Sequence, residues 1–503
     1  MTPLFSILFI VYAGMLLVSP TLYPVYQDEA RYWSLMGLEL PEMLNWLSGE
    51  VYPPLYFLML KAWSALFGRS GGVLRIPSMI FALGAFVVFF RLLKTFLPGK
   101  RVVTCLVLFA LLPFGLFSFR LAKYFSLLVF LFLLSTHEFL EIAESDKKTG
   151  KHKILYVLYS VLMIYTHYLG ILGLFAHAAS FLITSGGRKY FRKIFPAHAA
   201  AAILFAPWIV IFLSQAGEVS GMAPAEFSHS VKAGSLRTAY LFYAFLFGNS
   251  VEPWHFIIAG TGALLMALGF VGNIFILKNK PGNAYPMIFC IFVTGIFLGI
   301  IASIILFPYL HFLFLPERLI FLLPLFAVLL GCGLYEMKIL RYPAFVVLGG
   351  LLLFSVYNYY SRSETTIWAY RIEWRDIKSR ISKSGANIII FDNYNLGMLG
   401  EYYLERDFDV ISAWNREESE YSLDSEEMNH LRNFWFIRTT NDSSPGEAMN
   451  ELEKILDEKF GVEKELQFLK ENPGLEKLKS RIRGEASPTR KFKLKALHYR
   501  EEY

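Results

Sequence analysis

The sequence predicts a polytopic α-helical membrane protein of about 11 transmembrane helices, followed by a small α/β domain outside the membrane. The chain of 503 residues is 55% hydrophobic and only 18% charged, whereas soluble domains carry about 25% charged residues. Apolar runs close to the length of a membrane span recur through residues 1–358. In residues 359–503 the pattern changes to alternating helices and strands. These observations predict a transmembrane domain and a C-terminal soluble domain.

The apolar runs give the predicted spans in chain order. They lie at 3–20, 76–97, 102–119, 124–142, 154–166, 168–185, 195–213, 255–277, 284–307, 319–337 and 343–358. The two runs that flank THYLG are short for spans, so we expect them to be kinked or tilted. The run 238–248 is shorter still and is predicted to lie at the membrane interface. The first run lacks a basic n-region and a cleavage site, so we expect a retained span rather than a signal peptide.

The basic residues indicate the orientation of the spans. If the N-terminus is cytoplasmic, every inner loop is short and basic, as the positive-inside rule requires. The basic residues of these inner loops are Arg91, Lys94, Lys100, Arg101, Lys147, Lys148, Lys151, Lys153, Arg188, Lys189, Arg192, Lys193, Lys278, Lys280, Lys338 and Arg341. The loops 21–75 and 214–254 and the domain 359–503 then face outward. We therefore expect a multi-pass protein of the plasma (inner) membrane with an extracytoplasmic C-terminal domain.

The C-terminal domain is predicted from its local patterns. The stretch EWRDIKSRISKSGANIIIFDNYNLGMLGEYYLERDFDVISAW is typical of helix, buried strand, helix and strand. Further on, NHLRNFWFIRTT predicts a strand, SPGEAMNELEKILDEKFGV an amphipathic helix, and RKFKLKALHYR an edge strand. The domain has no Gly-rich phosphate loop and no nucleophile elbow, so we assign it no catalysis.

Charge and cysteine content argue against two other classes of protein. The formal net charge is +7, but the basic residues form short clusters between apolar runs, which is a sign of membrane topology and not of nucleic-acid binding. The three cysteines, Cys105, Cys290 and Cys332, lie inside apolar runs. They provide neither a disulfide framework nor a CxxC metal site.

The stretch YPVYQDEARYW places adjacent carboxylates, Asp28 and Glu29, where the chain leaves the first span. Ionisable residues at a membrane face are costly to desolvate and tend to be functional. The alternative is structural, with one carboxylate capping the following helix and Arg31 pairing with Asp28. The same outward loop contains the rigid segment Tyr52-Pro53-Pro54. A helix cap does not require this second feature, so the loop is a candidate site.

Four basic residues lie at the outer ends of spans, where the positive-inside rule gives no reason for them. They are Arg75, Arg120, Lys123 and Arg318. Each one alone can be a snorkelling residue with its charge in the headgroup region. Four such residues at one membrane face favour a phosphate clamp formed by at least two of them.

Aromatic residues and a histidine surround the same outer face. The tyrosines Tyr23, Tyr26, Tyr32, Tyr52 and Tyr56 form either an interfacial belt or a surface that stacks against a sugar ring. His167 lies at a short outward turn, where it is either a packing residue or, with Asp28 and Glu29, part of a divalent site for Mg²⁺ or Mn²⁺. The residue spacing does not require a metal.

The order of several motifs resembles a known superfamily. The series DEA-x-Y-W, x-PP-L-Y-F and F-G-x-S-x-G-x-L-R-x-P-S resembles the first extracytoplasmic loop of GT-C glycosyltransferases. The similarity is to family 39-like enzymes, related to dolichyl-phosphate-mannose protein mannosyltransferases and the lipid A aminoarabinose transferase. AKYFSLLVFLFLLS, THYLGILGLFAH, PERLIFLLPLFAVLLGCGL and EWRDI continue the resemblance through Ile377.

The sequence also departs from the family pattern. Tyr52 replaces the histidine of the family's His-Pro-Pro, so the contacts of that histidine are in doubt. Lys123 stands where arginine is usual, Phe125 where tyrosine is usual, and Leu319 replaces the tyrosine after Arg318. The acidic pair is intact.

The resemblance implies an inverting glycosyltransferase that moves a sugar from an undecaprenyl- or dolichyl-type polyprenyl phosphate to an extracytoplasmic glycan, lipid or protein. This chemistry needs a carboxylate to accept the proton of the acceptor hydroxyl and cations to hold the leaving phosphate. By resemblance, Asp28 is the general base, and Glu29 orients it, binds a metal or pairs with Arg31. The remaining predicted site residues are Lys123, Arg318, Arg120 and Arg75 for the phosphate, and Tyr52, Pro53, Tyr32 and His167 for the substrate.

Two other classes of function remain as alternatives. A transporter or a lipid flippase of envelope precursors suits this number of spans, but it predicts inverted repeats and carboxylates or broken helices at mid-membrane. A non-catalytic scaffold would not need the acidic pair, the Pro-Pro segment and the outward cations together. The sequence specifies neither the sugar nor the acceptor, and protein hydroxyls, lipid A phosphate, teichoic acid and other envelope glycans all fit.

Overall fold

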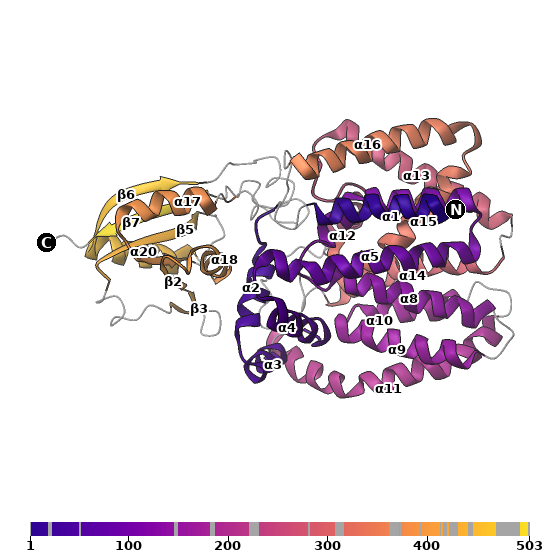
Figure 1. Ribbon diagram of the computed structural model, residues 1–503, viewed down its shortest axis with the longest axis horizontal. Helices are drawn as coiled ribbons and strands as arrows, with labels where there is room; N and C mark the ends of the chain where they lie inside the picture. Colours follow the sequence, from indigo (N-terminus) through magenta and orange to yellow (C-terminus); the bar gives the residue numbers. More distant parts are fainter. Residues whose placement is uncertain are drawn as a thin grey trace. The chain divides into compact units, whose positions relative to one another are not determined.

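The computed structural model divides the chain into two compact units. Unit 1 comprises Met1–Leu22 and Leu38–Glu364, and unit 2 comprises Tyr23–Gly37 and Thr365–Tyr503. Unit 1 is helical, whereas unit 2 contains a β-sheet with helices (Figure 1). The residues that the structure describes are 2–18, 23–49, 52–144, 149–181, 187–220, 231–279, 282–306, 316–361, 372, 374–392, 394–412, 414–415, 420–421, 431–440, 446–468 and 493–500.

The helices of unit 1 include every predicted apolar run, and two of them, Leu40–Gly49 and Leu55–Phe67, lie within the predicted outer loop 21–75. Their bounds are α1 (Thr2–Leu17), α3 (Leu40–Gly49), α4 (Leu55–Phe67), α5 (Gly71–Phe96), α6 (Gly99–Leu111), α7 (Pro113–Ser118), α8 (Phe125–Glu144), α9 (Gly150–Thr166), α10 (Gly170–Ser180), α11 (Gly187–Ser220), α12 (Val231–Phe247), α13 (Phe256–Lys278), α14 (Ala284–Leu306), the 3-10 helix η2 (Pro316–Leu322), α15 (Leu323–Tyr335), the 3-10 helix η3 (Lys338–Leu340) and α16 (Arg341–Ser361). Helix α12 occupies much of the predicted outer loop 214–254, of which residues 221–230 lie outside the described part.

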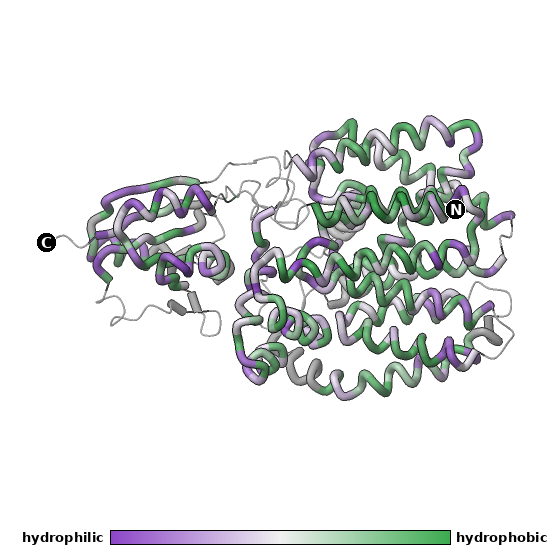
Figure 2. Tube along the Cα trace, in the orientation of Figure 1, coloured by the Kyte–Doolittle hydropathy of each residue, from purple (hydrophilic) through white to green (hydrophobic). Residues whose placement is uncertain are grey.

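Length and composition show which helices can cross a membrane. Seven helical segments among the described residues are long and apolar enough, and four shorter apolar helices lie at Pro3–Leu17, Leu55–Phe67, Gly170–Ser180 and Thr238–Phe247. Figure 2 shows the helices of unit 1 mainly in the colour of hydrophobic residues. The predicted fold class is therefore confirmed. The number of about 11 spans, the orientation and the domain boundary at residues 358 and 359 stay predictions.

Helices α13 and α15 pack backbone against backbone. A Cβ atom at Gly272 would meet the carbonyl oxygen of Gly333 at 2.0 Å, so only glycine permits this approach. The buried side chain of Asn273 donates a hydrogen bond across the pair to the carbonyl oxygen of Leu329, at 2.9 Å. Small residues and interhelical hydrogen bonds of this kind hold helices together in lipid. This packing fixes α15, and η2, which carries Arg318, leads directly into it.

Unit 2 is built around a five-stranded sheet of order β2-β1-β5-β7-β6, in which β1 is parallel to β2 and β5 and the other pairs are antiparallel. Its elements are α2 (Gln27–Gly37), α17 (Trp374–Ile381), the 3-10 helix η5 (Ser382–Ser384), β1 (Ile388–Phe391), α18 (Tyr394–Leu404), β2 (Asp409–Ser412), β3 (Trp414–Asn415), β4 (Glu420–Tyr421), β5 (Asn433–Thr440), α20 (Gly446–Lys459), β6 (Gly461–Gln467) and β7 (Lys493–Arg500). The predicted order of helix, strand, helix and strand is confirmed.

The prediction of an edge strand at RKFKLKALHYR is wrong. Strand β7 lies inside the sheet, paired with β5 on one side and β6 on the other. The edge is β6, whose sequence GVEKELQ is too polar to stand out as a strand. Charged edge strands are common because they discourage pairing with another chain. The same polarity that discourages pairing at this edge explains why the sequence pattern did not predict β6 as a strand.

Candidate active site

Three of the predicted site residues, Lys123, His167 and Arg318, come together in unit 1. A guanidinium nitrogen of Arg318, Nη1, lies 3.0 Å from Nε2 of His167 and also donates a hydrogen bond to the hydroxyl of Tyr124. The rings of Tyr124 and His167 stack with their centroids 4.4 Å apart. Lys123 precedes Tyr124 in the turn 119–124 that leads into α8. We call Lys123, Tyr124, His167 and Arg318 the cation cluster.

The backbone of Lys123 is held by two helices of unit 1. Its carbonyl oxygen accepts a hydrogen bond from the hydroxyl of Ser78 on α5, at 3.1 Å. The same hydroxyl lies 3.0 Å from the hydroxyl of Tyr56 on α4. All three residues are buried. The turn that carries Lys123 is therefore tied to the helices that follow the Pro53-Pro54 segment.

His167 ends α9 with an extended backbone, at φ −161° and ψ 133°. Its Nδ1 accepts a hydrogen bond from the backbone N–H of Leu169, at 3.1 Å. Burial, together with the charges of Arg318 and Lys123, lowers the pKa of His167 well below its ordinary value. The ring of His167 is therefore neutral. Arg318 thus presents its N–H donors beside a polar ring that adds no positive charge of its own.

Positive charge in this buried region is costly. Lys123 is only 8% exposed, and its ammonium lies 4.7 Å from the ring centroid of Phe125, a contact that offsets part of the desolvation cost. Buried cations inside a membrane bundle mark ion or substrate sites by default. The cation cluster therefore has the chemistry of an anion site.

The other two predicted phosphate ligands are also buried in unit 1. Arg75 lies on α5 and Arg120 lies in the turn after α7, each with 1% of its surface exposed. The guanidinium carbon of Arg120 is 5.9 Å from the ring centroid of Phe117 and 5.6 Å from that of Tyr359. Both arginines belong to the same bundle as the cation cluster. Their part in phosphate binding stays a prediction.

Tyr52 and Pro53 lie at the start of α4. The ring of Tyr52 stacks on Trp46, with centroids 6.3 Å apart, and meets Phe57 edge to face at 5.6 Å. Pro53 is buried. The residue that replaces the family's histidine is thus an aromatic that packs among other aromatic side chains.

The predicted acidic pair lies on α2 in unit 2. Glu29 is buried, and its Oε2 accepts a hydrogen bond from the backbone N–H of Tyr26, at 3.0 Å. This is the carboxylate half of a capping box, so the structural alternative for Glu29 is observed. Asp28 is partly exposed in the first turn of the helix, where the helix dipole favours a carboxylate. A role for Asp28 as general base stays a prediction.

Helix α2 belongs to the hydrophobic core of unit 2. The backbone N–H of Val25 donates to the hydroxyl of Tyr403 on α18. The rings of Trp33 and Tyr402 meet edge to face with centroids 5.3 Å apart. Val25 and Ala30 share one core cluster with residues of α17, α18 and the sheet. Tyr32, a predicted substrate contact, is buried on the same helix. The C-terminal domain therefore holds the helix that carries the acidic pair.

Metal binding receives no geometric support within the described part of the chain. No three His, Cys, Asp or Glu side chains there are placed to share a metal ion. Asp28 and Glu29 lie in unit 2 and His167 in unit 1. The predicted Mg²⁺ or Mn²⁺ site stays a prediction.

Sequence reasoning missed Tyr124 and Ser78. Tyr124 lies between Lys123 and Phe125, two positions that the family comparison considered, and its contacts with Arg318 and His167 make it a centre of the cluster. A serine in an apolar helix gives a weak signal, because its partner, the Lys123 carbonyl, is 45 residues away in the sequence.

Comparison with known proteins bears on the fold of the chain. Residues 51–211 match the family described as dolichyl-phosphate-mannose-protein mannosyltransferase. The structure of ArnT from Cupriavidus metallidurans bound to undecaprenyl phosphate is similar at a TM-score of 0.60 and 11% identity, over 98% of this chain and 97% of that one. Its apo structure gives 0.57 at the same identity and coverage. The chain has the GT-C fold. This confirms the resemblance that the sequence motifs indicate.

The structure of a second enzyme is also similar to this chain, with a lower TM-score. The archaeal oligosaccharyltransferase AglB from Archaeoglobus fulgidus, in complex with an inhibitory peptide and a dolichol-phosphate, is similar at a TM-score of 0.52 and 10% identity, over 86% of this chain and 69% of that one. No curated protein sequence matches the chain. The family match includes Lys123 and His167 but neither Arg318 nor α2.

Proposed function

We propose that this GT-C protein is an inverting glycosyltransferase that transfers a sugar from a polyprenyl phosphate to an acceptor outside the membrane. The cation cluster is the observation that carries the proposal. It joins a lysine, an arginine and a neutral histidine from three distant parts of the chain. A buried group of donors is stabilised by an anion, and a membrane-borne phosphate is an anion that reaches such a bundle.

The donors of the cluster suit a leaving phosphate. Arg318 can present parallel N–H groups to phosphate oxygens, and Lys123 adds a point charge. His167 adds a neutral polar ring beside Arg318. Negative charge on the phosphate grows as the bond from the anomeric carbon to the phosphate oxygen breaks. Donors that are already in place stabilise this charge without reorganisation.

The acceptor supplies the new bond in this reaction. Its hydroxyl oxygen attacks the anomeric carbon from the face opposite the phosphate, and the polyprenyl phosphate departs with the bonding electron pair. Asp28 is the proposed base that takes the hydroxyl proton. Glu29 contributes by closing the first turn of α2 through its bond to Tyr26.

The similar structures support the class of donor. ArnT is described bound to undecaprenyl phosphate, and AglB is described with a dolichol-phosphate and a peptide. Both lipids are polyprenyl phosphates. We infer a donor of the same class for this chain and an acceptor that is a glycan, a lipid or a protein.

The C-terminal domain has a role in the same proposal. It carries no nucleotide or nucleophile motif, yet its helix α18 and its core hold α2. We infer that this domain positions Asp28 for proton transfer. Effective general bases need accurate placement, because a small displacement of a reacting group lowers the rate strongly.

The test uses the full-length protein reconstituted in nanodiscs with a panel of polyprenyl-phosphate sugars. Mass spectrometry of the products follows the slow transfer of the sugar to water or to added acceptors. We expect one donor to be consumed, with inverted stereochemistry at the anomeric carbon. A protein that moves labelled donor across a proteoliposome membrane without forming any new glycosidic bond would be a transporter or flippase, and the proposal would be wrong.

A further inference from the structure

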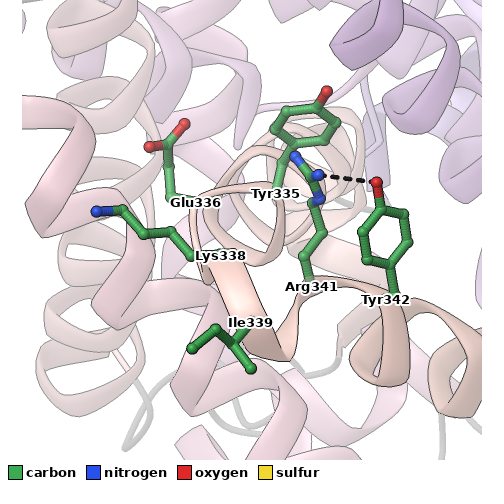
Figure 3. Close-up of a pocket in the computed structure, with 6 residues that line it drawn as sticks. All are labelled: Tyr335, Glu336, Lys338, Ile339, Arg341 and Tyr342. Atoms are coloured by element: carbon green, nitrogen blue, oxygen red, sulfur yellow. Dashed lines mark hydrogen bonds between the residues drawn. The ribbon is translucent and has the colours of Figure 1, made fainter.

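A cavity of about 500 Å³ lies where α15 ends and α16 begins, well within the size range of ligand pockets. It is lined by Tyr335, Glu336, Lys338, Ile339, Arg341 and Tyr342 (Figure 3). Arg318 precedes α15 and Tyr335 ends it, so the cavity and the cation cluster lie at opposite ends of this helix. The proposed glycosyl transfer does not use this cavity.

Arg341 is fixed in the cavity by two aromatic rings. Its guanidinium carbon lies 4.6 Å from the ring centroid of Tyr335 and 4.7 Å from that of Tyr342. A guanidinium nitrogen donates a hydrogen bond to the Tyr342 hydroxyl, at 3.0 Å (Figure 3). An arginine clamped in this way is oriented before a ligand arrives, so binding costs less side-chain entropy. A merely snorkelling arginine needs no such clamp.

The charge of the cavity is positive. Glu336 is paired with Arg101 on α6, which leaves Lys338 and Arg341 as the uncompensated charges. Neither of these two residues has an ion pair with another described residue. Lys338 also has a backbone φ of +35° and is the only described residue other than glycine with a positive φ. This strained conformation costs free energy and places a lysine where glycine would be relaxed.

An exposed apolar surface adjoins the positive charges. Ile339 is 90% exposed. Along α16, Tyr342, Val346, Leu353 and Tyr357 follow the spacing of one helix face, and each of them is at least 60% exposed. A cationic cavity at the head of an apolar helix face has the chemistry of a phospholipid, which joins a charged headgroup to an acyl chain. Free phosphate would use only the cavity.

We propose that this cavity binds the headgroup phosphate of an anionic phospholipid, with an acyl chain along the exposed face of α16. Arg341 holds the phosphate, Lys338 adds positive charge from the other side of the cavity (Figure 3), and Ile339 and the α16 face contact the chain. In the predicted orientation this loop is cytoplasmic, the side whose surface carries anionic lipids. The site is independent of the proposed transferase activity.

The experiment uses the full-length protein in nanodiscs of phosphatidylcholine with a minor fraction of phosphatidylglycerol. Native mass spectrometry after release from the nanodisc counts the phosphatidylglycerol molecules that stay bound. A basic residue beside the bound anionic headgroup strengthens its binding about fivefold. We therefore expect about a fivefold loss for Lys338→Gln or Arg341→Gln and a larger loss for the double variant. Lys338 is exposed, so its variant keeps the fold.

The matched control is the pair Arg91→Gln and Lys94→Gln, which removes two basic residues of another predicted inner loop, at the end of α5. We expect it to retain wild-type phosphatidylglycerol. An equal loss in the control, or no loss in the Lys338 and Arg341 variants, would overturn the proposal. A third arm adds inorganic phosphate or glycerol phosphate to the wild type. If either displaces phosphatidylglycerol at concentrations near that of the lipid, the site recognises phosphate alone and the lipid assignment is wrong.

Discussion

The cation cluster and the acidic helix α2 supply the two halves of the proposed chemistry, but they are built in different ways. The cluster takes its residues from three distant segments of unit 1, and the side chains of Tyr124, His167 and Arg318 contact one another. The acidic pair comes from one short helix, capped locally by Glu29 and held by the core of unit 2. In the proposed function, donor binding therefore depends on unit 1 and proton transfer depends on unit 2. Substitutions in one region should therefore leave the function of the other largely intact.

The largest effect is expected for Asp28→Asn. A positioned general base contributes about 10²–10⁴-fold to rate, so we expect sugar transfer to fall by about a thousandfold while donor binding is kept. Single-turnover kinetics measures the rate, and equilibrium binding of the donor measures the affinity. The control is Glu29→Gln, whose amide oxygen can still accept the bond from Tyr26. Full activity of Asp28→Asn would exclude Asp28 as the base.

The next effect is expected in the other region, for Arg318→Lys. The lysine keeps the charge but loses the fork of N–H donors that contacts Tyr124 and faces His167. A hydrogen bond to a charged group contributes about 1.5–3 kcal/mol, so donor affinity should fall about tenfold or more. Isothermal titration with the donor measures this change. If Arg318→Lys lowers the rate of transfer and leaves donor affinity unchanged, the assignment of donor binding to the cation cluster is wrong.

A smaller effect is expected for Tyr403→Phe, which removes the hydroxyl that accepts the bond from Val25. Loosening the start of α2 should lower kcat several-fold and leave the donor KM unchanged. The control is Tyr499→Phe, which removes a hydroxyl bonded to Asp457 elsewhere in unit 2, at 2.6 Å. Both variants lose one partly buried hydrogen bond, about 1 kcal/mol of stability. If both lower kcat equally, the domain stabilises the protein without positioning Asp28.

The smallest effect concerns pH and the neutral state of His167. Its pKa is lowered in the folded protein, whereas in the unfolded chain it is near 6.5. Below about pH 6.5 the unfolded chain binds a proton that the folded protein does not, so stability falls as the pH falls. Above that pH the residue contributes no pH dependence. His167→Gln should flatten this part of the thermal stability profile, and the exposed His255→Gln should leave it unchanged. An unaltered profile in His167→Gln would mean that the ring is protonated in the fold.

The sequence predicted more of the helices than of the site. Each apolar run falls on helical segments because, in lipid, a helix satisfies the backbone hydrogen bonds within a single segment, so the requirement is local. The convergence of Lys123, His167 and Arg318 followed from the order of the motifs. Tyr124 was missed because nothing distinguishes a clustered tyrosine from an interfacial one until its partners are known.

Two further features depend on contacts that a local pattern does not contain. The hydrogen bond from Val25 to Tyr403 joins residues 378 positions apart. The residues near α2 therefore do not indicate that this helix belongs to the core of the C-terminal domain. Strand β7 was predicted to be at an edge because its partner β6 is highly charged. In both cases packing between distant segments decides the structure.

The most direct test of the account is equilibrium binding of undecaprenyl phosphate, without a sugar, to the full-length protein and two variants. The account predicts that Asp28→Asn binds this lipid like the wild type, whereas the double variant Lys123→Gln, Arg318→Gln binds about a hundredfold more weakly or not at all, from the loss of two charged contacts. Equal binding by the wild type and a folded double variant would contradict the assignment of the cation cluster as the phosphate site.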